Sequence, residues 1–173
     1  MLTIRFAGVA DTELVADLSR QTFYETFAHL NAKEHMDKFM GEQFTKEALM
    51  KEVEAPDNIF LLAFSDNEPV GYARLRENNN PPELENTNSI EIARIYTVAN
   101  SIGKGVGKAL MQECINIAVE KGKEQIWLGV WQQNERAIDF YKKWGFEIFA
   151  THIFLLGEDP QTDWLMKKLL TSA

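Results

Sequence analysis

Three glycines at alternate positions form the first group of residues that could do chemistry. Closely spaced glycines let consecutive backbone N–H groups turn toward one point, and a helix that starts there adds the positive end of its dipole. This geometry binds phosphate groups, and two lysines in the same stretch add positive charge. The sequence therefore predicts a cradle for a diphosphate, made by Gly103, Lys104, Gly105, Val106, Gly107 and Lys108.

The same turn has an interpretation without a ligand, in which it only joins a strand to a helix. It is not a Walker A loop, because its second glycine is not followed by Lys-Ser or Lys-Thr at the required spacing. It is not a dinucleotide-binding turn either, because the third glycine of G-x-G-x-x-G is missing. The turn alone leaves the phosphate cradle and the plain turn as alternatives.

A second motif lies downstream, over residues 134–146. It has the spacing N-x-x-A-x-x-F-Y-x-x-x-G-F, from Asn134 through Tyr141 to Phe146. This spacing resembles a signature of the GNAT acetyltransferases, and residues 95–110 resemble the coenzyme A motif of that family. The two motifs occur in the family's order, with a predicted strand between them. Further likeness, to the bacterial spermidine/spermine N-acetyltransferases, is carried by residues 22–27, 90–96, 126–131 and 161–163.

The resemblance implies a fold, a co-substrate and an acceptor. The implied fold is GNAT-like and α+β (mixed α/β), with a central, mostly antiparallel twisted sheet of about six or seven strands flanked by helices, in a single domain over residues 1–173. The implied co-substrate is acetyl-CoA, and the implied acceptor is a small-molecule primary amine, best guessed as a polyamine such as spermidine or spermine. One departure is Ile102, where the family usually has Arg or Gln. It removes a side-chain donor but leaves the backbone cradle intact.

Acetylation of an amine needs a proton acceptor and a proton donor. An aliphatic amine is only about one part in a thousand neutral at physiological pH, which costs roughly 4 kcal/mol, so a base must remove its proton. The resemblance places that base at Glu91, whose alternative role is an ordinary carboxylate at a strand end. It places the acid that protonates the departing thiolate at Tyr141, whose alternative role is a core aromatic beside Phe140.

The remaining candidate residues contact the cofactor or the acceptor. The resemblance implies that backbone at Ile95, Tyr96 and Thr97 pairs with the pantetheine arm and stabilises charge on the thioester oxygen. It implies a cofactor contact for Asn134, which also suits a helix cap. Lys143 could reach the phosphates or lie on a solvated helix face. For the acceptor we expect acids and aromatics, with Tyr24, Glu25 and Trp131 as candidates, although both aromatics suit a core or rim position equally well.

Two other functions stay open at this point. One is a protein or peptide N-acetyltransferase, which needs an open groove in place of a narrow acidic one. The other is a non-catalytic acyl-CoA-binding regulatory module, which keeps the glycine turn but loses the acid and the base. The presence of both Glu91 and Tyr141 favours an enzyme.

Hydrophobic periodicity predicts the elements that must position these residues. Caps and turn residues give the boundaries: Asp11 and Thr45 suit helix N-caps, and Gly145 suits a helix stop. Residues 66–69 read as a hairpin turn, 78–88 as a mobile loop and 156–160 as a loop. The expected strands are 3–6, 59–64, 70–75, 90–98, 126–131, 146–150 and 162–169, and the expected helices run from residue 11 to about 27 or 30, over 33–40, from 45, over 106–120 and over 134–144.

Composition excludes several classes of function. The net charge of −8, from 26 acids and 18 bases, argues against general nucleic-acid binding. The single cysteine, Cys114, fits a packing role in a reducing compartment, and the scattered histidines predict no metal site. The absence of a long apolar run predicts no membrane segment, so we expect a cytoplasmic protein. A homodimer is expected only from the family resemblance.

Overall fold

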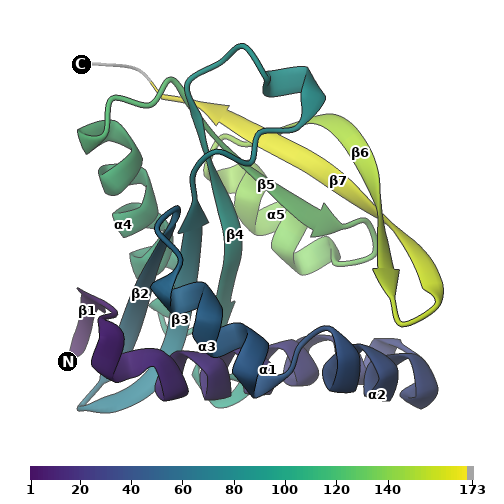
Figure 1. Ribbon diagram of the computed structural model, residues 1–173. Helices are drawn as coiled ribbons and strands as arrows, with labels where there is room; N and C mark the ends of the chain where they lie inside the picture. Colours follow the sequence, from purple (N-terminus) through teal and green to yellow (C-terminus); the bar gives the residue numbers. More distant parts are fainter. Residues whose placement is uncertain (171–173) are drawn as a thin grey trace.

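A seven-stranded sheet forms the centre of the computed structural model, which describes residues 1–170 (Figure 1). Its order is β1-β2-β3-β4-β5-β7-β6, and every neighbouring pair is antiparallel except β4 and β5. The predicted mixed, mostly antiparallel sheet is therefore confirmed. The strands are β1 (Leu2–Phe6), β2 (Asn58–Ser65), β3 (Glu68–Arg76), β4 (Ser89–Thr97), β5 (Gln125–Trp131), β6 (Glu147–Leu156) and β7 (Asp159–Leu169).

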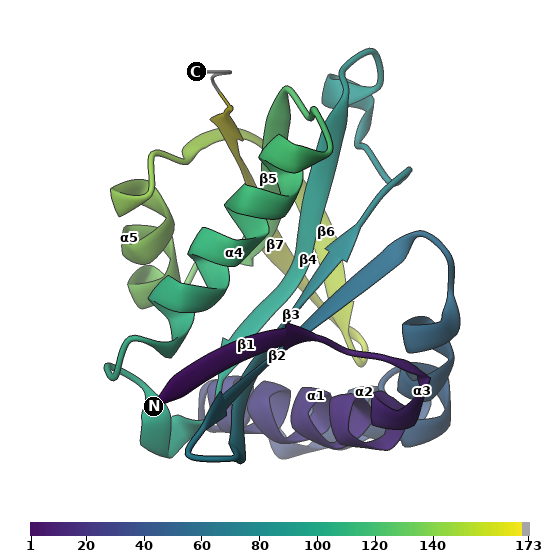
Figure 2. The ribbon, with the colours of Figure 1, turned by 90° about the vertical axis from the view of Figure 1, so that its left-hand side faces the viewer.

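Five α-helices within the described residues cover the two faces of this sheet. α1 (Thr12–Phe27), α2 (Lys33–Glu42) and α3 (Lys46–Glu54) lie together on one face, and α4 (Val106–Glu120) and α5 (Glu135–Lys143) lie on the other (Figure 1 and Figure 2). The predicted caps are confirmed at two helices, because the side chains of Thr45 and Asn134 each accept a backbone N–H bond in the first turn. No helix in this part of the chain is both long and apolar enough to cross a bilayer.

The parallel pair of strands separates part of the way along its length. The ladder between β4 and β5 ends where Ile92 lies opposite Leu128. Beyond that pair β4 continues to Thr97 and β5 to Trp131, and Figure 1 shows the two strands diverging. A strand that loses its neighbour leaves backbone N–H and C=O groups unpaired. The sheet therefore opens a slot edged by free backbone, which we call the β4–β5 slot.

A bulge in β4 lies where the slot begins. Arg94 pairs with Arg74 on β3, whereas Ile92 pairs with the adjacent Leu75, so the register skips Ala93. The ladder to β5 has also ended at this point. Because a bulge bends a strand and re-aims its groups, the backbone at Ala93 is free of both ladders beside the slot.

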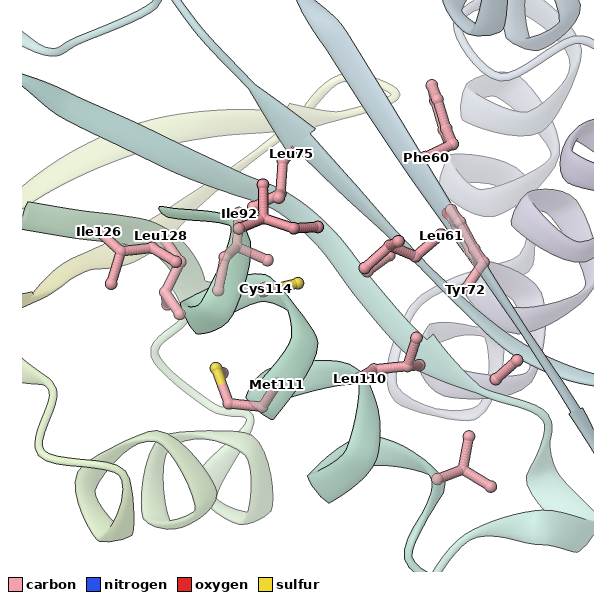
Figure 3. Packing of buried hydrophobic residues seen from close by; sticks show 14 of the residues in the cluster. Phe60, Leu61, Tyr72, Leu75, Ile92, Leu110, Met111, Cys114, Ile126 and Leu128 are labelled. Carbon is pink, nitrogen blue, oxygen red and sulfur yellow. The ribbon is translucent and has the colours of Figure 1, made fainter. Parts of the chain in front are cut away.

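The main core lies between the sheet and α4. Leu61, Leu75 and Ile92 of the strands meet Leu110 and Cys114 of the helix, and each is at most 2% exposed (Figure 3). Burial raises the pKa of the Cys114 thiol to about 12, so the thiol stays protonated and unreactive. The predicted packing role of this cysteine is confirmed.

The C-terminal hairpin is longer than the sequence indicated. β6 extends to Leu156 and β7 begins at Asp159, so the expected loop over 156–160 shrinks to Gly157 and Glu158, with Gly157 at φ +64°. β6 is an edge strand whose side chains are mostly exposed. Without a buried face it lacks the apolar alternation that marks a strand, which explains the short prediction of 146–150.

One further prediction is corrected by hydrogen bonds. Asp11 occupies the N-cap position of α1, but its side chain accepts from Arg5 at 2.8 and 2.9 Å and from the backbone of Gly8 at 2.8 Å, and does not cap the helix. The segment over 78–88 is a loop, as predicted, and contains a 3-10 turn over Pro82–Leu84 with Leu84 only 2% exposed. The side chain of Asn80 holds that turn through the carbonyls of Leu84 and Thr87.

Candidate active site

A cavity of about 1570 Å³ occupies the β4–β5 slot and the adjoining face of the sheet that carries α1. Side chains from α1, β3, β4, β5, α5, β6 and β7 form its wall. The structure brings together there most residues that the sequence singled out: Glu25, Glu91, Ile95, Tyr96, Thr97, Gly103, Gly105, Gly107, Lys108, Trp131, Asn134 and Tyr141. Four others, Tyr24, Lys104, Val106 and Lys143, do not line it.

The glycine turn supplies a helix N-terminus to the cavity. Gly103 and Gly105 adopt φ values of +83° and +88°, a region that other L-residues rarely enter. Gly105 is the N-cap of α4, whose first N–H groups have no acceptor within the helix. These free N–H groups and the helix dipole suit a diphosphate. The backbone here therefore fits the phosphate end of coenzyme A.

Val106, Lys108 and the adjacent Ile102 differ in what they could contribute to cofactor binding. Val106 is 3% exposed and packs into the main core, so only its backbone is available to a ligand. Ile102, where a side-chain donor was missing, is 40% exposed and lines the cavity, as does Lys108. A cofactor here would be held by backbone amides with support from Lys108.

The free edge of β4 suits the extended part of the cofactor. Ile95, Tyr96 and Thr97 lie beyond the end of the β5 ladder and line the cavity. An extended chain with amide groups can pair with such an edge as an added strand. The pantetheine arm of coenzyme A has two amides and an extended shape, so it matches this edge.

Tyr141 lies on α5 and lines the cavity with its side chain almost buried. It is 8% exposed, and its ring lies 5.6 Å from the centroid of Phe140 and 5.9 Å from that of Phe146. Burial raises the pKa of the Tyr141 hydroxyl above its ordinary value. A phenol held protonated in this way can donate a proton but does not act as a base at neutral pH. Asn134, which also lines the cavity, caps α5 by accepting from the Ala137 N–H at 3.3 Å.

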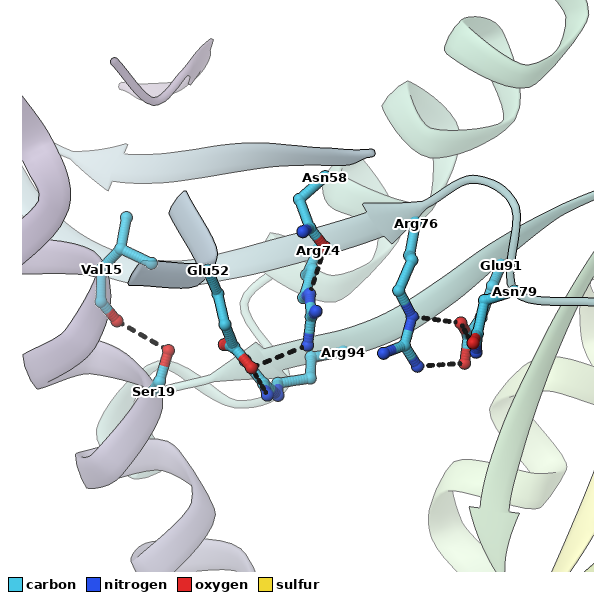
Figure 4. A network of polar contacts seen from close by, with 9 residues as sticks. All are labelled: Val15, Ser19, Glu52, Asn58, Arg74, Arg76, Asn79, Glu91 and Arg94. Atoms are coloured by element: carbon cyan, nitrogen blue, oxygen red, sulfur yellow. Dashed lines mark hydrogen bonds and ion pairs between the residues drawn. The ribbon is translucent and has the colours of Figure 1, made fainter. Parts of the chain in front are cut away.

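Glu91 lies at the closed end of the slot and is paired. Its two oxygens accept from Arg76, at 2.7 Å from Nε and 3.1 Å from Nη2, and Oε1 also accepts from Asn79 at 3.0 Å (Figure 4). The side chain of Glu91 is only 9% exposed. The bidentate pair fixes the orientation of the carboxylate toward the cavity.

A second ionic cluster, which sequence reasoning missed, lies beside Glu91. Glu52 of α3 accepts from Arg94 at 2.7 and 2.9 Å and from Arg74 at 3.1 Å (Figure 4). Burial and the neighbouring Arg94 lower the pKa of Arg74 to about 10. All three side chains line the cavity. Strand alternation puts Arg74 and Arg76 on one face, but only the three-dimensional placement of α3 brings Glu52 to them.

The acceptor candidates fall into two groups. Trp131 is 9% exposed, lines the cavity and packs edge-on to Phe27 at 6.1 Å. Glu25 also lines the cavity, where it accepts from the backbone N–H of Ala99 at 3.0 Å. Tyr24 is 51% exposed and lies outside the cavity, because it is one helical step from Glu25 on α1 and faces another direction. The prediction that Tyr24 lines the acceptor site is therefore wrong.

Asp163 and His152 are cavity residues that the sequence did not single out. They are register partners on β7 and β6, with His152 Nε2 3.6 Å from Asp163 Oδ2. Burial raises the pKa of Asp163 to about 6, against a smaller lowering effect of His152. The segment over 161–163 contributed to the family resemblance, but its pattern alone gave no indication of a site.

Comparison with known proteins connects this geometry to an activity. The model of the "Acetyltransferase (GNAT) family" matches residues 15–146. The chain is 38% identical, over 98% of its length and 99% of the relative, to an uncharacterized N-acetyltransferase in the pepI 3′ region of Lactobacillus delbrueckii subsp. lactis. It is 29% identical, over 87% of its length and 91% of the relative, to a spermidine N(1)-acetyltransferase of Thermoplasma acidophilum.

Solved structures agree with these sequence relationships. The PaiA N-acetyltransferase of Thermoplasma acidophilum, in complex with coenzyme A, superposes with a TM-score of 0.79 at 27% identity, covering 98% of this chain and 99% of that one. The putative acetyltransferase yncA of Salmonella typhimurium, with its cofactor acetyl-CoA, superposes with a TM-score of 0.75 at 21% identity, covering 100% and 96%. The second likeness shows the shared fold alone.

Proposed function

The chain belongs to the acetyltransferase (GNAT) family, whose members transfer acetyl groups from acetyl-CoA to amines, and we propose that its acceptor is a primary amine of a small polyamine such as spermidine or spermine. The observation that carries this proposal is the convergence of the glycine turn, the free edge of β4, Tyr141 and several acids on one cavity. The likeness to a spermidine N(1)-acetyltransferase over 87% of the chain supports it. Asp163, an acid of the wall that no lysine or arginine of the described residues pairs with, supports a cationic acceptor.

The proposed mechanism begins with the cofactor contacts. The N–H groups at the start of α4 bind the diphosphate, and Ile95 to Thr97 pair with the pantetheine arm. This arrangement directs the thioester toward the bulge at Ala93. Free backbone N–H groups at the bulge are suited to stabilise negative charge on the thioester oxygen. Acetyl-CoA supplies the activated acetyl group, and the chain orients it.

Proton transfer is assigned to Glu91 and Tyr141. Glu91 is our candidate acceptor for the proton of the ammonium group, and since Arg76 and Asn79 occupy its oxygens, we propose that the proton reaches it through a water molecule. Tyr141 is our candidate donor to the departing sulfur, because it lines the cavity and its phenol carries a proton at neutral pH.

The experiment that tests this proposal is an amine screen with acetyl-CoA in which the released thiol is measured. We expect turnover of spermidine, with a free peptide bearing an N-terminal amine as the comparison. Turnover of the peptide alone would replace the polyamine by a peptide acceptor. Binding of acetyl-CoA without any turnover would favour the regulatory-module alternative.

We infer a cytoplasmic setting and keep a homodimer as a proposal. The buried free thiol of Cys114 is compatible with a reducing compartment. The exposed apolar side chains of Ile148, Ile153 and Leu155 lie along the edge strand β6, where a second copy could pack. Sedimentation velocity of the purified chain tests the dimer.

A further inference from the structure

Asp163 lies at the open end of the β4–β5 slot, beside two residues of β5. It is the register partner of Trp131 on that strand. Gly129, two residues earlier on the same face, has no side chain, and a Cβ atom built there would lie 3.7 Å from Asp163 Oδ2. Because Gly129 has no side chain, β5 leaves the Asp163 carboxylate uncovered on this side, next to Leu165 Cδ2, which would lie 3.5 Å from such a Cβ.

The carboxylate of Asp163 has no strong partner. Within residues 1–170 no Lys or Arg nitrogen lies within 4.0 Å of it and no hydrogen bond to it is made. Its nearest titratable neighbour is His152 at 3.6 Å, and the histidine side chain is 53% exposed. By contrast, Glu52 is matched by two arginines and Glu91 by one.

A carboxylate with little exposure and no cationic partner destabilises the protein when no ligand is bound. The Asp163 side chain is only 18% exposed, and a poorly hydrated carboxylate needs a cation or donors to compensate it. Its raised pKa reflects the same desolvation. The titratable groups that face the Asp163 carboxylate are His152 on β6 and Tyr96 on β4. Its neighbours on β5, Trp131 and Gly129, carry no titratable side chain. A bound cation would supply the missing partner.

Trp131 gives the same position a second feature that suits a cation. Its ring lines the cavity next to Asp163, and the face of a tryptophan ring attracts ammonium groups within about 6 Å. A carboxylate and an indole side by side on neighbouring strands suit a primary ammonium group. The space left by Gly129 lets an unbranched alkyl chain reach it.

We propose that Asp163, together with Trp131, is the binding site for an ammonium group of the acceptor other than the one that is acetylated, at the open end of the slot. This inference rests on the proposed amine acetyltransferase function and assigns the residue that selects the cation. Glu91 lies at the other end of the slot, opposite Trp127. Asp163 thus serves binding, while proton removal stays with Glu91.

The test compares Asp163→Asn with the wild-type protein in two measurements. The first is protection against thermal unfolding by spermidine, 1,4-diaminobutane or n-butylamine, with saturating coenzyme A present. The second is the KM for the amine in the thiol-release assay. Asp159→Asn makes the same change of charge on the same strand but outside the cavity, and it is the matched control.

We expect Asp163→Asn to abolish the protection and to raise the amine KM at least tenfold while the KM for acetyl-CoA stays the same. Equal protection and equal amine KM in the variant and the wild type would overturn the assignment, and so would failure of all three amines to protect the wild type. Turnover with an unchanged KM in the variant removes the site but leaves the acetyltransferase function. Protection that depends on Asp163 without turnover of any amine removes the function but leaves the site.

Discussion

The carboxylate of Glu91 is held by the guanidinium of Arg76 through two hydrogen bonds of 2.7 and 3.1 Å. The pair joins adjacent strands, since Arg76 on β3 is the register partner of Glu91 on β4. It directs both side chains into the cavity rather than into the core. A carboxylate whose orientation is fixed in this way can order a water molecule in the cavity.

The first prediction concerns Glu91→Gln. The amide keeps the shape and the bond from Arg76 but cannot take up a proton. We expect kcat to fall by about 10²-fold, the usual scale for a proton-transfer group, with the amine KM changed little. Steady-state kinetics on spermidine check this. A variant with wild-type kcat would assign Glu91 to an ordinary structural ion pair.

The second prediction concerns Tyr141→Phe, which removes the hydroxyl and keeps the ring packing against Phe140 and Phe146. We expect kcat to fall by about 10²-fold or more with acetyl-CoA binding retained, as measured by titration calorimetry. Tyr24→Phe, on the exposed surface outside the cavity, is the matched control and should keep full activity. Equal rates for Tyr141→Phe and wild type would remove Tyr141 from the mechanism.

The third prediction concerns Gly105→Ala at the start of α4. A Cβ here meets no atom within 4 Å, so the effect comes from φ +88° alone, a left-handed conformation that costs a non-glycine residue about 1–2 kcal/mol. We expect the turn to relax away from this conformation and the KM for acetyl-CoA to rise roughly tenfold, the equivalent of about 1.4 kcal/mol.

Gly41→Ala provides the comparison for that variant. Gly41 lies in α2 with free space around a Cβ and without a positive φ. Alanine in a helix interior is favoured over glycine by about 1 kcal/mol, so this change should stabilise the fold and leave the acetyl-CoA KM unaltered. An unchanged KM in Gly105→Ala as well would mean that the backbone of the turn does not bind the diphosphate.

The parts of the fold that were predictable from the sequence are those with strong local signals. The glycines at Gly103 and Gly105 and the caps at Thr45 and Asn134 mark element boundaries by backbone chemistry. The mostly exposed edge strand β6 has no such signal, because its pairing with β7 comes from the hairpin and not from burial. Its length followed only from the three-dimensional structure.

The residues of the candidate site differ in the same way: some follow from a local sequence motif, and others are brought together only by the three-dimensional structure. Tyr141 and Asn134 belong to one contiguous motif, so a family resemblance locates them. The pairing of Glu91 with Arg76 depends on a register shifted by the bulge at Ala93. The approach of Asp163 to His152 depends on a long hairpin. Such contacts between distant residues are set by register, and a one-residue change in register would put the side chains on the opposite face.

The last prediction is a pH dependence of stability caused by Asp163. Its pKa is about 6 in the folded protein and ordinarily 3.8. Below pH 3.8 the group is protonated in both states and costs nothing. Between pH 3.8 and about 6 the unfolded chain has released this proton while the folded protein still holds it, so stability falls as the pH rises across this window, and the loss is complete above it.

Asp163→Asn removes that loss. We expect the variant and the wild type to have the same free energy of unfolding near pH 4, where the wild-type side chain is also neutral. Above pH 7 the variant should be more stable, by at most about 3 kcal/mol, even though its amine binding is impaired. Urea denaturation at the two pH values measures the difference. A variant that is less stable than wild type at pH 8 would mean that the Asp163 carboxylate stabilises the folded protein. It would contradict the inference that this carboxylate lacks a partner until a cation binds.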